Sequence, residues 1–153
     1  MQAWWHRAIR TPARQSTKLS MARKTESYVD TSAFIAFLDQ SDSYYPSVKR
    51  MFADPPALTT SALVIAEGHG WFLQRYDQRR ALAFLNFIQA LPIRIAAFDG
   101  LELGKAQAFV KKFADQKLTL ADAHGLAIMK TQGIATCWST DRHLGLTGAT
   151  LVC

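Results

Sequence analysis

Short apolar runs alternate with longer segments of helical periodicity along residues 27–153. The apolar runs that fit β-strands lie at Tyr28–Val29, Ala57–Thr60, Ile93–Phe98 and Ile134–Trp138, and a short fifth strand fits Ala149–Val152. The intervening patterns predict helices over about Ala33–Asp39, from the Ser41–Ser43 break to Ala53, and over Ser61–Tyr76, Gln78–Leu91, Gly100–Ala114 and Leu120–Gln132. No hairpin signal lies between the strands. The pattern therefore predicts an α/β domain with a mostly parallel sheet of four to five strands between helix layers.

The charge is distributed unevenly and divides the chain in two. The formal net charge is +6, yet residues 1–26 hold six Lys/Arg and one acid, which leaves residues 27–153 almost neutral. Residues 1–26 show no clear apolar period and no hydrophobic core of a secretory signal. We expect this segment to be a basic, disordered extension, or to precede Met21 as the residue at which translation starts. Its composition also mildly resembles a transit peptide. The domain proper is then residues 27–153.

Composition excludes several classes of protein. With 153 residues, 49% hydrophobic and 20% charged, the chain has the length and composition of one globular domain. The chain contains no run of eighteen apolar residues, so the sequence predicts no membrane-spanning helix. The two cysteines, Cys137 and Cys153, are too few for a disulfide framework or a four-ligand zinc site. A reducing, cytoplasmic location is the expectation that follows.

Four carboxylates fall near one edge of the predicted sheet. Asp30 ends the first strand, Asp141 follows the fourth, and Asp122 lies in the first turn of the helix after Leu118. Each of these three has an ordinary structural interpretation as a helix cap, a first-turn acid or a turn residue. Glu67 is less ordinary, because its apolar flanks predict a carboxylate on a helix face turned toward the protein, where burial without a partner is costly.

Taken together, the four carboxylates indicate a metal site. Ligands of an open parallel sheet bind beyond the carboxyl ends of the strands, where the strand order reverses. Anions held close together repel one another unless a cation neutralises them, and the neighbouring sequence offers few Lys or Arg partners. Mg²⁺ prefers carboxylate oxygens, water and phosphate. Such a site can activate water and stabilise phosphoryl charge, which points to phosphodiester hydrolysis.

At these positions the sequence resembles the PIN-domain family and, within it, the VapC-like toxin ribonucleases of type II toxin–antitoxin systems. The matching pieces occur in the expected order and span residues 27–144: Tyr28–Ala33, Ala66–Glu67, Leu118–Ala123 and Ser139–Leu144. The resemblance implies a three-layer α/β/α sandwich and a metal-dependent endoribonuclease that uses Mg²⁺ or Mn²⁺. The basic extension before Met21 departs from a typical compact member of the family.

Carried over residue by residue, the resemblance implies a site of four acids: Asp30, Glu67, Asp122 and Asp141. Asp30 and Asp122 would be direct metal ligands, and Glu67 and Asp141 would complete the site directly or through water. The hydroxyls of Ser32 and Thr140 would support the acids by hydrogen bonds. Arg142 and His143, in the loop at the same edge, are candidates for contact with an RNA phosphate. The family also implies a homodimer, an acidic antitoxin partner and an RNA substrate.

Other interpretations remain open at the level of sequence. A non-catalytic RNA- or protein-binding module on the same scaffold is one, and an aspartyl phosphatase is another, although the latter chemistry usually places a second Asp where Ser32 stands. His69 and His124 each follow a proposed ligand by two residues. A mixed histidine and carboxylate site is therefore an alternative, but a spacing of two on a helix directs side chains to different faces.

Overall fold

Five parallel strands form one sheet in the order β3–β2–β1–β4–β5 in a computed structural model that describes residues 25–153. The strands are β1 (Glu26–Val29), β2 (Ala57–Ser61), β3 (Ile93–Ala96), β4 (Thr136–Trp138) and β5 (Thr150–Leu151). All five predicted strands are present, including the short one near the carboxyl terminus. Each is short, as expected for strands buried between helix layers.

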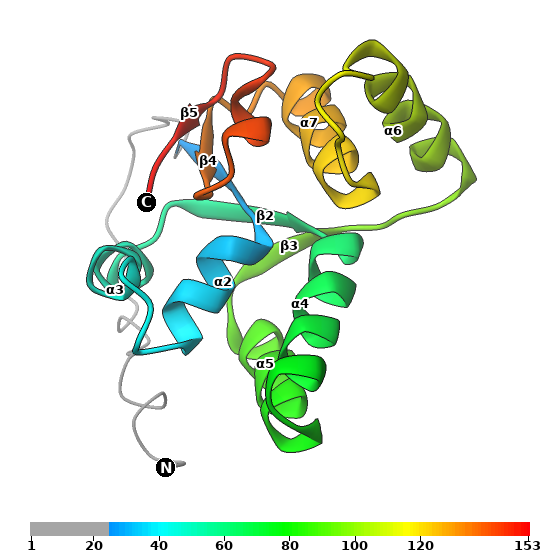
Figure 1. The fold of residues 1–153 in the computed structure, drawn as a ribbon. Coiled ribbons are helices and arrows are strands. Elements are labelled where there is room, and N and C mark those ends of the chain that lie inside the picture. Colours follow the sequence, from blue (N-terminus) through cyan, green and yellow to red (C-terminus); the bar gives the residue numbers. More distant parts are fainter. Residues whose placement is uncertain (1–24) are drawn as a thin grey trace.

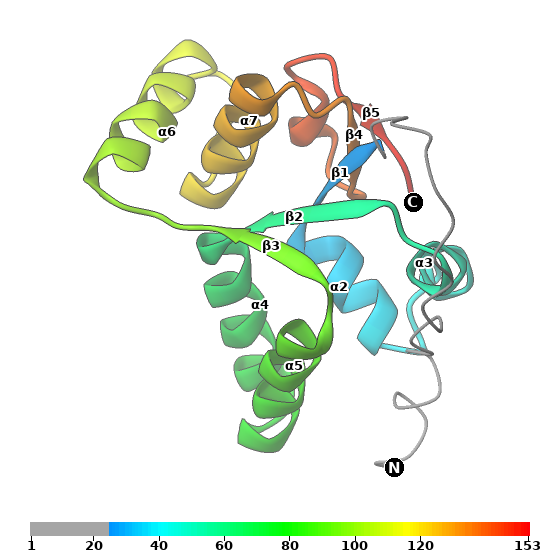
Figure 2. The same cartoon turned by 180° about the vertical axis from the view of Figure 1, so that it is seen from behind.

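Within residues 25–153, six α-helices cover the two faces of the sheet. They are α2 (Thr31–Leu38), α3 (Tyr45–Ala53), α4 (Ala62–Arg75), α5 (Gln78–Ala90), α6 (Gly100–Lys112) and α7 (Leu120–Gln132). Helices α6 and α7 lie together on one side, whereas α2, α4 and α5 lie on the other (Figures 1 and 2). The predicted three-layer α/β/α architecture with a parallel sheet is therefore confirmed.

Side-chain caps explain where most of these helices begin. Asp30, Ser61, Asp77, Asp99 and Thr119 are the N-cap residues of α2, α4, α5, α6 and α7, and each accepts a hydrogen bond from a backbone N–H of the first turn. The predicted helix boundaries agree with the structure to within about two residues. One element was not predicted, a 3₁₀ helix η1 (Arg142–Gly145) that follows β4.

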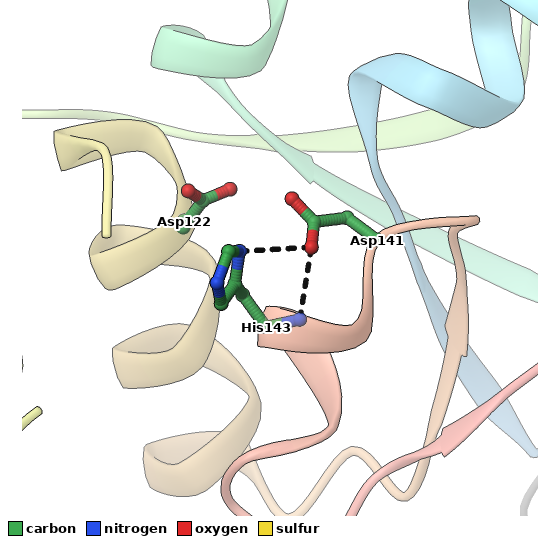
Figure 3. Close-up of side chains that lie close together, drawn as sticks. All are labelled: Asp122, Asp141 and His143. Atoms are coloured by element: carbon green, nitrogen blue, oxygen red, sulfur yellow. Dashed lines mark hydrogen bonds and ion pairs between the residues drawn. The ribbon is translucent and has the colours of Figure 1, made fainter. Parts of the chain in front are cut away.

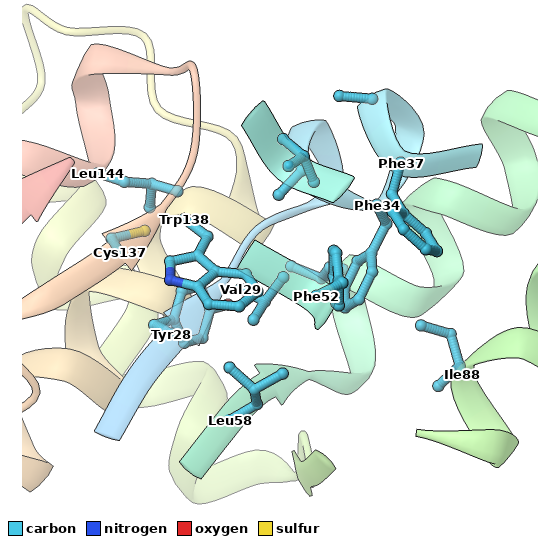
Figure 4. Close-up of a cluster of buried hydrophobic side chains, with 14 of the residues drawn as sticks. Tyr28, Val29, Phe34, Phe37, Phe52, Leu58, Ile88, Cys137, Trp138 and Leu144 are labelled. Carbon is cyan, nitrogen blue, oxygen red and sulfur yellow. The ribbon is translucent and has the colours of Figure 1, made fainter. Parts of the chain in front are cut away.

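The core between the sheet and α2, α3 and α5 is largely aromatic. Phe37 packs on Phe52 and Phe87 with ring centroids 4.6 and 5.0 Å apart, and Phe52 meets Trp138 of β4 edge-on at 5.1 Å. Figure 4 shows part of this cluster, from Cys137 and Leu144 across β1 to Phe34. The five phenylalanines predicted to pack rather than to stack on bases are all buried: Phe34, Phe37, Phe72, Phe84 and Phe87. Cys137 is buried, as predicted.

The strand order places the start of α2 at the reversal point of the sheet. The chain adds β2 and β3 on one side of β1 and then crosses to place β4 on the other side. The carboxyl ends of β1 and β4 are neighbours there, and the Asp30 N–H donates to the Trp138 carbonyl at 3.1 Å. This is where open α/β sheets bind their ligands.

The first strand shows where the folded part of the described residues begins. Glu26 lies within β1, where it accepts hydrogen bonds from Thr59 and Arg94, so the strand begins one residue before the predicted domain start. The rest of the predicted extension, residues 1–24, lies outside the described residues. Within residues 25–153, none of the helices has both the length and the apolar character needed to cross a bilayer.

Candidate active site at the switch point of the sheet

Asp30 is the most deeply enclosed of the four predicted acids, with 7% of its surface exposed. Its Oδ2 accepts hydrogen bonds from Ser32 Oγ at 2.8 Å and from Ser139 Oγ at 2.9 Å, and it also caps α2 by accepting from the Ser32 N–H. Burial raises the pKa of Asp30, and the hydrogen bonds partly offset that rise. Asp30 therefore fits both interpretations of the sequence, as an N-cap and as a candidate site residue.

Ser32 and Ser139 connect the start of α2 to the loop that carries Asp141. Their hydroxyls lie 3.3 Å apart, and the Asp141 N–H donates to Ser139 Oγ at 2.9 Å. The predicted hydroxyl Thr140 takes part through its backbone N–H, which donates to Ser32 Oγ at 3.1 Å. The sequence analysis missed Ser139, because the end of the strand at Trp138 does not show which of the following hydroxyl side chains faces Asp30. Its position directly after Trp138 was the available signal.

Asp122 is held by a capping box at the start of α7. Its Oδ2 accepts from the Thr119 N–H at 2.9 Å and from Thr119 Oγ1 at 2.8 Å, while the Asp122 N–H donates to Thr119 Oγ1 at 3.1 Å. The residue is 9% exposed. The helix sits close to β1 because Gly125 faces Tyr28, whose hydroxyl would lie 2.9 Å from a Cβ at that position.

Glu67 enters the site from α4 but is exposed, which corrects the expectation of a buried carboxylate. Of the apolar neighbours that suggested burial, only Val64 is buried, on the side of the helix that faces the core. Glu67 Oε2 accepts a hydrogen bond from Thr31 Oγ1 at 2.5 Å. Partial burial of the carboxylate raises the pKa of Glu67, the Thr31 hydrogen bond opposes this, and the charges of Asp30, Asp122 and Asp141 raise it further. These three acids therefore act on Glu67 at close range.

Asp141 caps η1 and faces Asp122 across the site. Its Oδ1 accepts from the His143 N–H at 2.9 Å and lies 2.9 Å from His143 Nδ1. One potential ligand atom from each of Asp122, Asp141 and His143 lies within 4.8 Å of the others (Figure 3). The fold thus brings α7 and the loop after β4 together at the predicted edge.

The charge of this cluster matches a divalent cation. Within residues 25–153, no Lys or Arg forms an ion pair with any of the four acids, and the single ion pair at this edge involves His143. Carboxylates that raise each other's pKa, as they do at Glu67, are relieved by a positive ion between them. An arrangement of oxygen donors with one imidazole fits Mg²⁺ or Mn²⁺.

Replacing Glu67 with glutamine is expected to stabilise the metal-free protein at pH 7. The raised pKa means that folding penalises the charged form, so wild-type stability falls as pH rises from the ordinary value of 4.5 through the raised pKa. The gain of E67Q should therefore shrink as pH falls toward 4.5. Denaturant titrations with chelator, from pH 4 to pH 8, measure it.

Glu102 provides a control of opposite sign for this experiment. A hydrogen bond and ion pair with Lys105 lower the pKa of Glu102, so the charged form is favoured in the folded state. E102Q should lose stability at pH 7, and that loss should vanish at low pH. A loss of stability at pH 7 in E67Q as well would contradict the repulsion among the four acids.

The remaining histidines of the domain have other environments. His124 is fully buried, its Nδ1 lies 2.7 Å from Ser61 Oγ, and its Nε2 lies 3.3 Å from a Glu102 carboxylate oxygen. Burial lowers the pKa of His124. This histidine therefore links α7 to α4 and α6 as a structural residue. Arg142 is exposed on η1, at the rim of the acid cluster.

Comparison with known proteins gives consistent matches. The PIN domain family matches residues 27–148. A ribonuclease of Mycobacterium tuberculosis, VapC26, is 26% identical over 115 residues, which cover 74% of this chain and 85% of that protein. The crystal structure of M. tuberculosis VapC20, described as a toxin that cleaves the sarcin–ricin loop, superposes with a TM-score of 0.74 at 23% identity, covering 81% of this chain and 96% of that one.

The family match and the geometry coincide. The matched residues contain β2, β3, β4, β1 from its second residue, and all four acids of the cluster. The fold of VapC20 is the fold described above. The resemblance seen in the sequence is confirmed, and the chain belongs to the PIN-domain family.

Proposed function

We propose that this protein is an endoribonuclease that depends on Mg²⁺ or Mn²⁺ and hydrolyses RNA phosphodiester bonds. The observation that carries the proposal is the convergence of Asp30, Glu67, Asp122 and Asp141 at the reversal point of the sheet, with no Lys or Arg of residues 25–153 to neutralise them. Similarity to two proteins described as a ribonuclease and an RNA-loop-cleaving toxin supports the choice of RNA.

The four acids have distinct tasks in this proposal. Asp30 and Asp122, both held by hydroxyl and backbone donors, are rigid enough to serve as direct ligands. Glu67 and Asp141 complete the site directly or through bound water. A divalent ion held by these residues would supply activation of a water molecule and stabilisation of the negative charge on the phosphoryl oxygens. Hydrolysis in this sense breaks the P–O3′ bond and leaves a 5′-phosphate and a 3′-hydroxyl.

Arg142 is the proposed contact for the RNA backbone. It is exposed at the rim of the site, and its guanidinium can bind a phosphate in a bidentate manner. His143 was an equal candidate from the sequence. The structure turns its ring toward Asp141, so the phosphate contact is assigned to Arg142.

Cleavage of a mixed RNA pool by the purified protein tests the proposed activity. The reactions contain Mg²⁺, Mn²⁺ or chelator, and the ends of the products are mapped. We expect metal-dependent cleavage and no hydrolysis of a small phosphate monoester. Metal binding without cleavage would indicate a narrowly specific target RNA. Absence of both cleavage and metal binding would favour the non-catalytic binding module, and monoester hydrolysis would favour a phosphatase.

Removing the Ser139 hydroxyl is expected to weaken metal binding. S139A takes one donor from Asp30 and the acceptor of the Asp141 N–H, so two proposed ligands lose their orientation together. Loss of such a supporting contact typically costs about 10–100-fold in metal affinity. Calorimetric titration with Mn²⁺ measures the change.

Thr140 provides the matched control for Ser139. It is the next residue and also carries a hydroxyl, but its hydrogen bond to Ser32 uses the backbone N–H. T140A should therefore bind Mn²⁺ within about threefold of wild type. Equal losses in the two variants would show that the loop as a whole, and not the Ser139 hydroxyl, positions the acids.

We further propose that the protein acts in the cytoplasm as the toxin of a toxin–antitoxin pair, as a homodimer bound by an acidic antitoxin. Both cysteines are free, which suits a reducing compartment, and the similarity to a protein described as a toxin supports the toxin role. Exposed apolar side chains on α6, such as Leu101 and Leu103, can supply a dimer interface. Induced expression should arrest growth, whereas expression of D30N should not. Light scattering should give twice the monomer mass.

A further inference from the structure

His143 is fixed within the acid cluster. Its backbone N–H and its ring nitrogen Nδ1 both lie 2.9 Å from the same oxygen, Asp141 Oδ1. Figure 3 shows the ring on the side of η1 that faces α7, with Asp122 on one side and Asp141 on the other. The side chain is only 23% exposed. The imidazole therefore points into the site and not toward solvent.

Asp141 and His143 are two residues apart, yet their side chains meet, which they would not do on a regular α-helix. On an α-helix, residues i and i+2 point to different faces, which separates His69 from Glu67. Asp141 instead has an extended backbone, with φ −90° and ψ 115°, and η1 begins immediately after it. The chain turns back at this cap. Residue 143 consequently meets the carboxylate of residue 141.

The distances suit a shared metal ion. Adjacent ligands of an octahedral ion with bonds of about 2.1 Å lie about 3 Å apart. Asp141 Oδ1 and His143 Nδ1 are 2.9 Å apart, and the Asp122 oxygen completes a set within 4.8 Å. The contact between His143 Nδ1 and Asp141 Oδ1 already has the separation of two ligands of one ion. The tautomer with the proton on Nε2 frees Nδ1 for coordination.

We propose that His143 is a nitrogen ligand of the metal centre, acting with Asp122 and Asp141, and that this nitrogen makes the centre select Mn²⁺ over Mg²⁺. The inference rests on the proposed metal-dependent function and extends it to a fifth residue. Imidazole nitrogen is a favourable donor for transition metals, whereas Mg²⁺ prefers oxygen. A neutral ligand also adds no further negative charge to four carboxylates.

The decisive measurement is pulsed electron paramagnetic resonance of the Mn²⁺-loaded full chain, free of any polyhistidine tag. A directly bound imidazole nitrogen produces ¹⁴N modulation, which carboxylates and water do not. The test variant is H143N, whose amide oxygen can take the place of Nδ1 and keep an oxygen donor beside Asp141. The matched control is H69N, because His69 likewise follows a site acid by two residues. Calorimetry gives Mn²⁺ and Mg²⁺ affinities for each protein.

We expect ¹⁴N modulation in wild type and H69N and its loss in H143N. The Mn²⁺ affinity of H143N should fall by at least about tenfold, with Mg²⁺ affinity changed by less than about threefold. Mn²⁺ bound without ¹⁴N modulation in wild type, or modulation that persists in H143N, would overturn the assignment of His143 and leave the proposed nuclease intact. Failure of wild type to bind either ion would overturn both.

Discussion

Replacing Asp30 with asparagine is expected to leave the fold intact and to reduce RNA cleavage by at least about three orders of magnitude. The asparagine carbonyl can still accept the hydrogen bonds from Ser32 and Ser139 and can still cap α2. The negative charge that would hold the metal is gone. Because burial raises the pKa of Asp30, the metal-free variant should melt at or above the wild-type temperature. Cleavage rates and melting curves, with and without Mn²⁺, measure both effects.

D122N should behave in the same way, since its amide oxygen can preserve the capping box with Thr119. Asp39 is the control, because it ends the same helix that Asp30 begins, and it lies away from the acids. D39N should cleave at the wild-type rate. Full activity in the D30N/D122N double variant would remove these residues from the site, and loss of activity in D39N would show that the assay reports stability.

Replacing Phe84 with alanine is expected to lower the free energy of unfolding by about 3–5 kcal/mol and the melting temperature by roughly 10–20 °C. Phe84 is fully buried between Phe72 and Phe34, with ring centroids 5.4 and 6.1 Å away. Its ring also fills the space above Gly68, where an added Cβ would lie 2.6 Å from the ring tip. The loss opens a cavity between α4, α5 and α2. Urea titration followed by tryptophan fluorescence gives the value.

Leu82 lies two residues earlier on α5 and is 52% exposed, so L82A should change stability by no more than about 0.5 kcal/mol.

A second test uses Gly68 to check the contact between α4 and the Phe84 ring. G68A should cost about 1–3 kcal/mol in the wild-type background and much less beside F84A, because the ring it collides with is absent. Additive effects of G68A and F84A would show that the two positions do not share this contact.

The sequence predicted the site mainly through residues at the ends of strands. Asp30 and Asp141 could be placed because a parallel sheet brings the carboxyl ends of its strands to one edge, and Asp122 because α7 starts beside them. Ser139 could not be preferred to Thr140, since the choice depends on which of the two side chains faces Asp30. The environment of Glu67 was misjudged because apolar neighbours on a helix show the composition of the segment but not which face is buried.

By itself the sequence determined the α/β class and the order of the elements, because strand length, helical period and capping residues are local properties of the chain. It also predicted a site of four acids. The tertiary structure decided which atoms meet. Only the crossing from β3 to β4 places Ser139 against Asp30, and only the turn into η1 brings His143 back onto Asp141 beside Asp122. Contacts between residues more than a hundred positions apart depend on the packing of whole layers, which a local pattern does not encode.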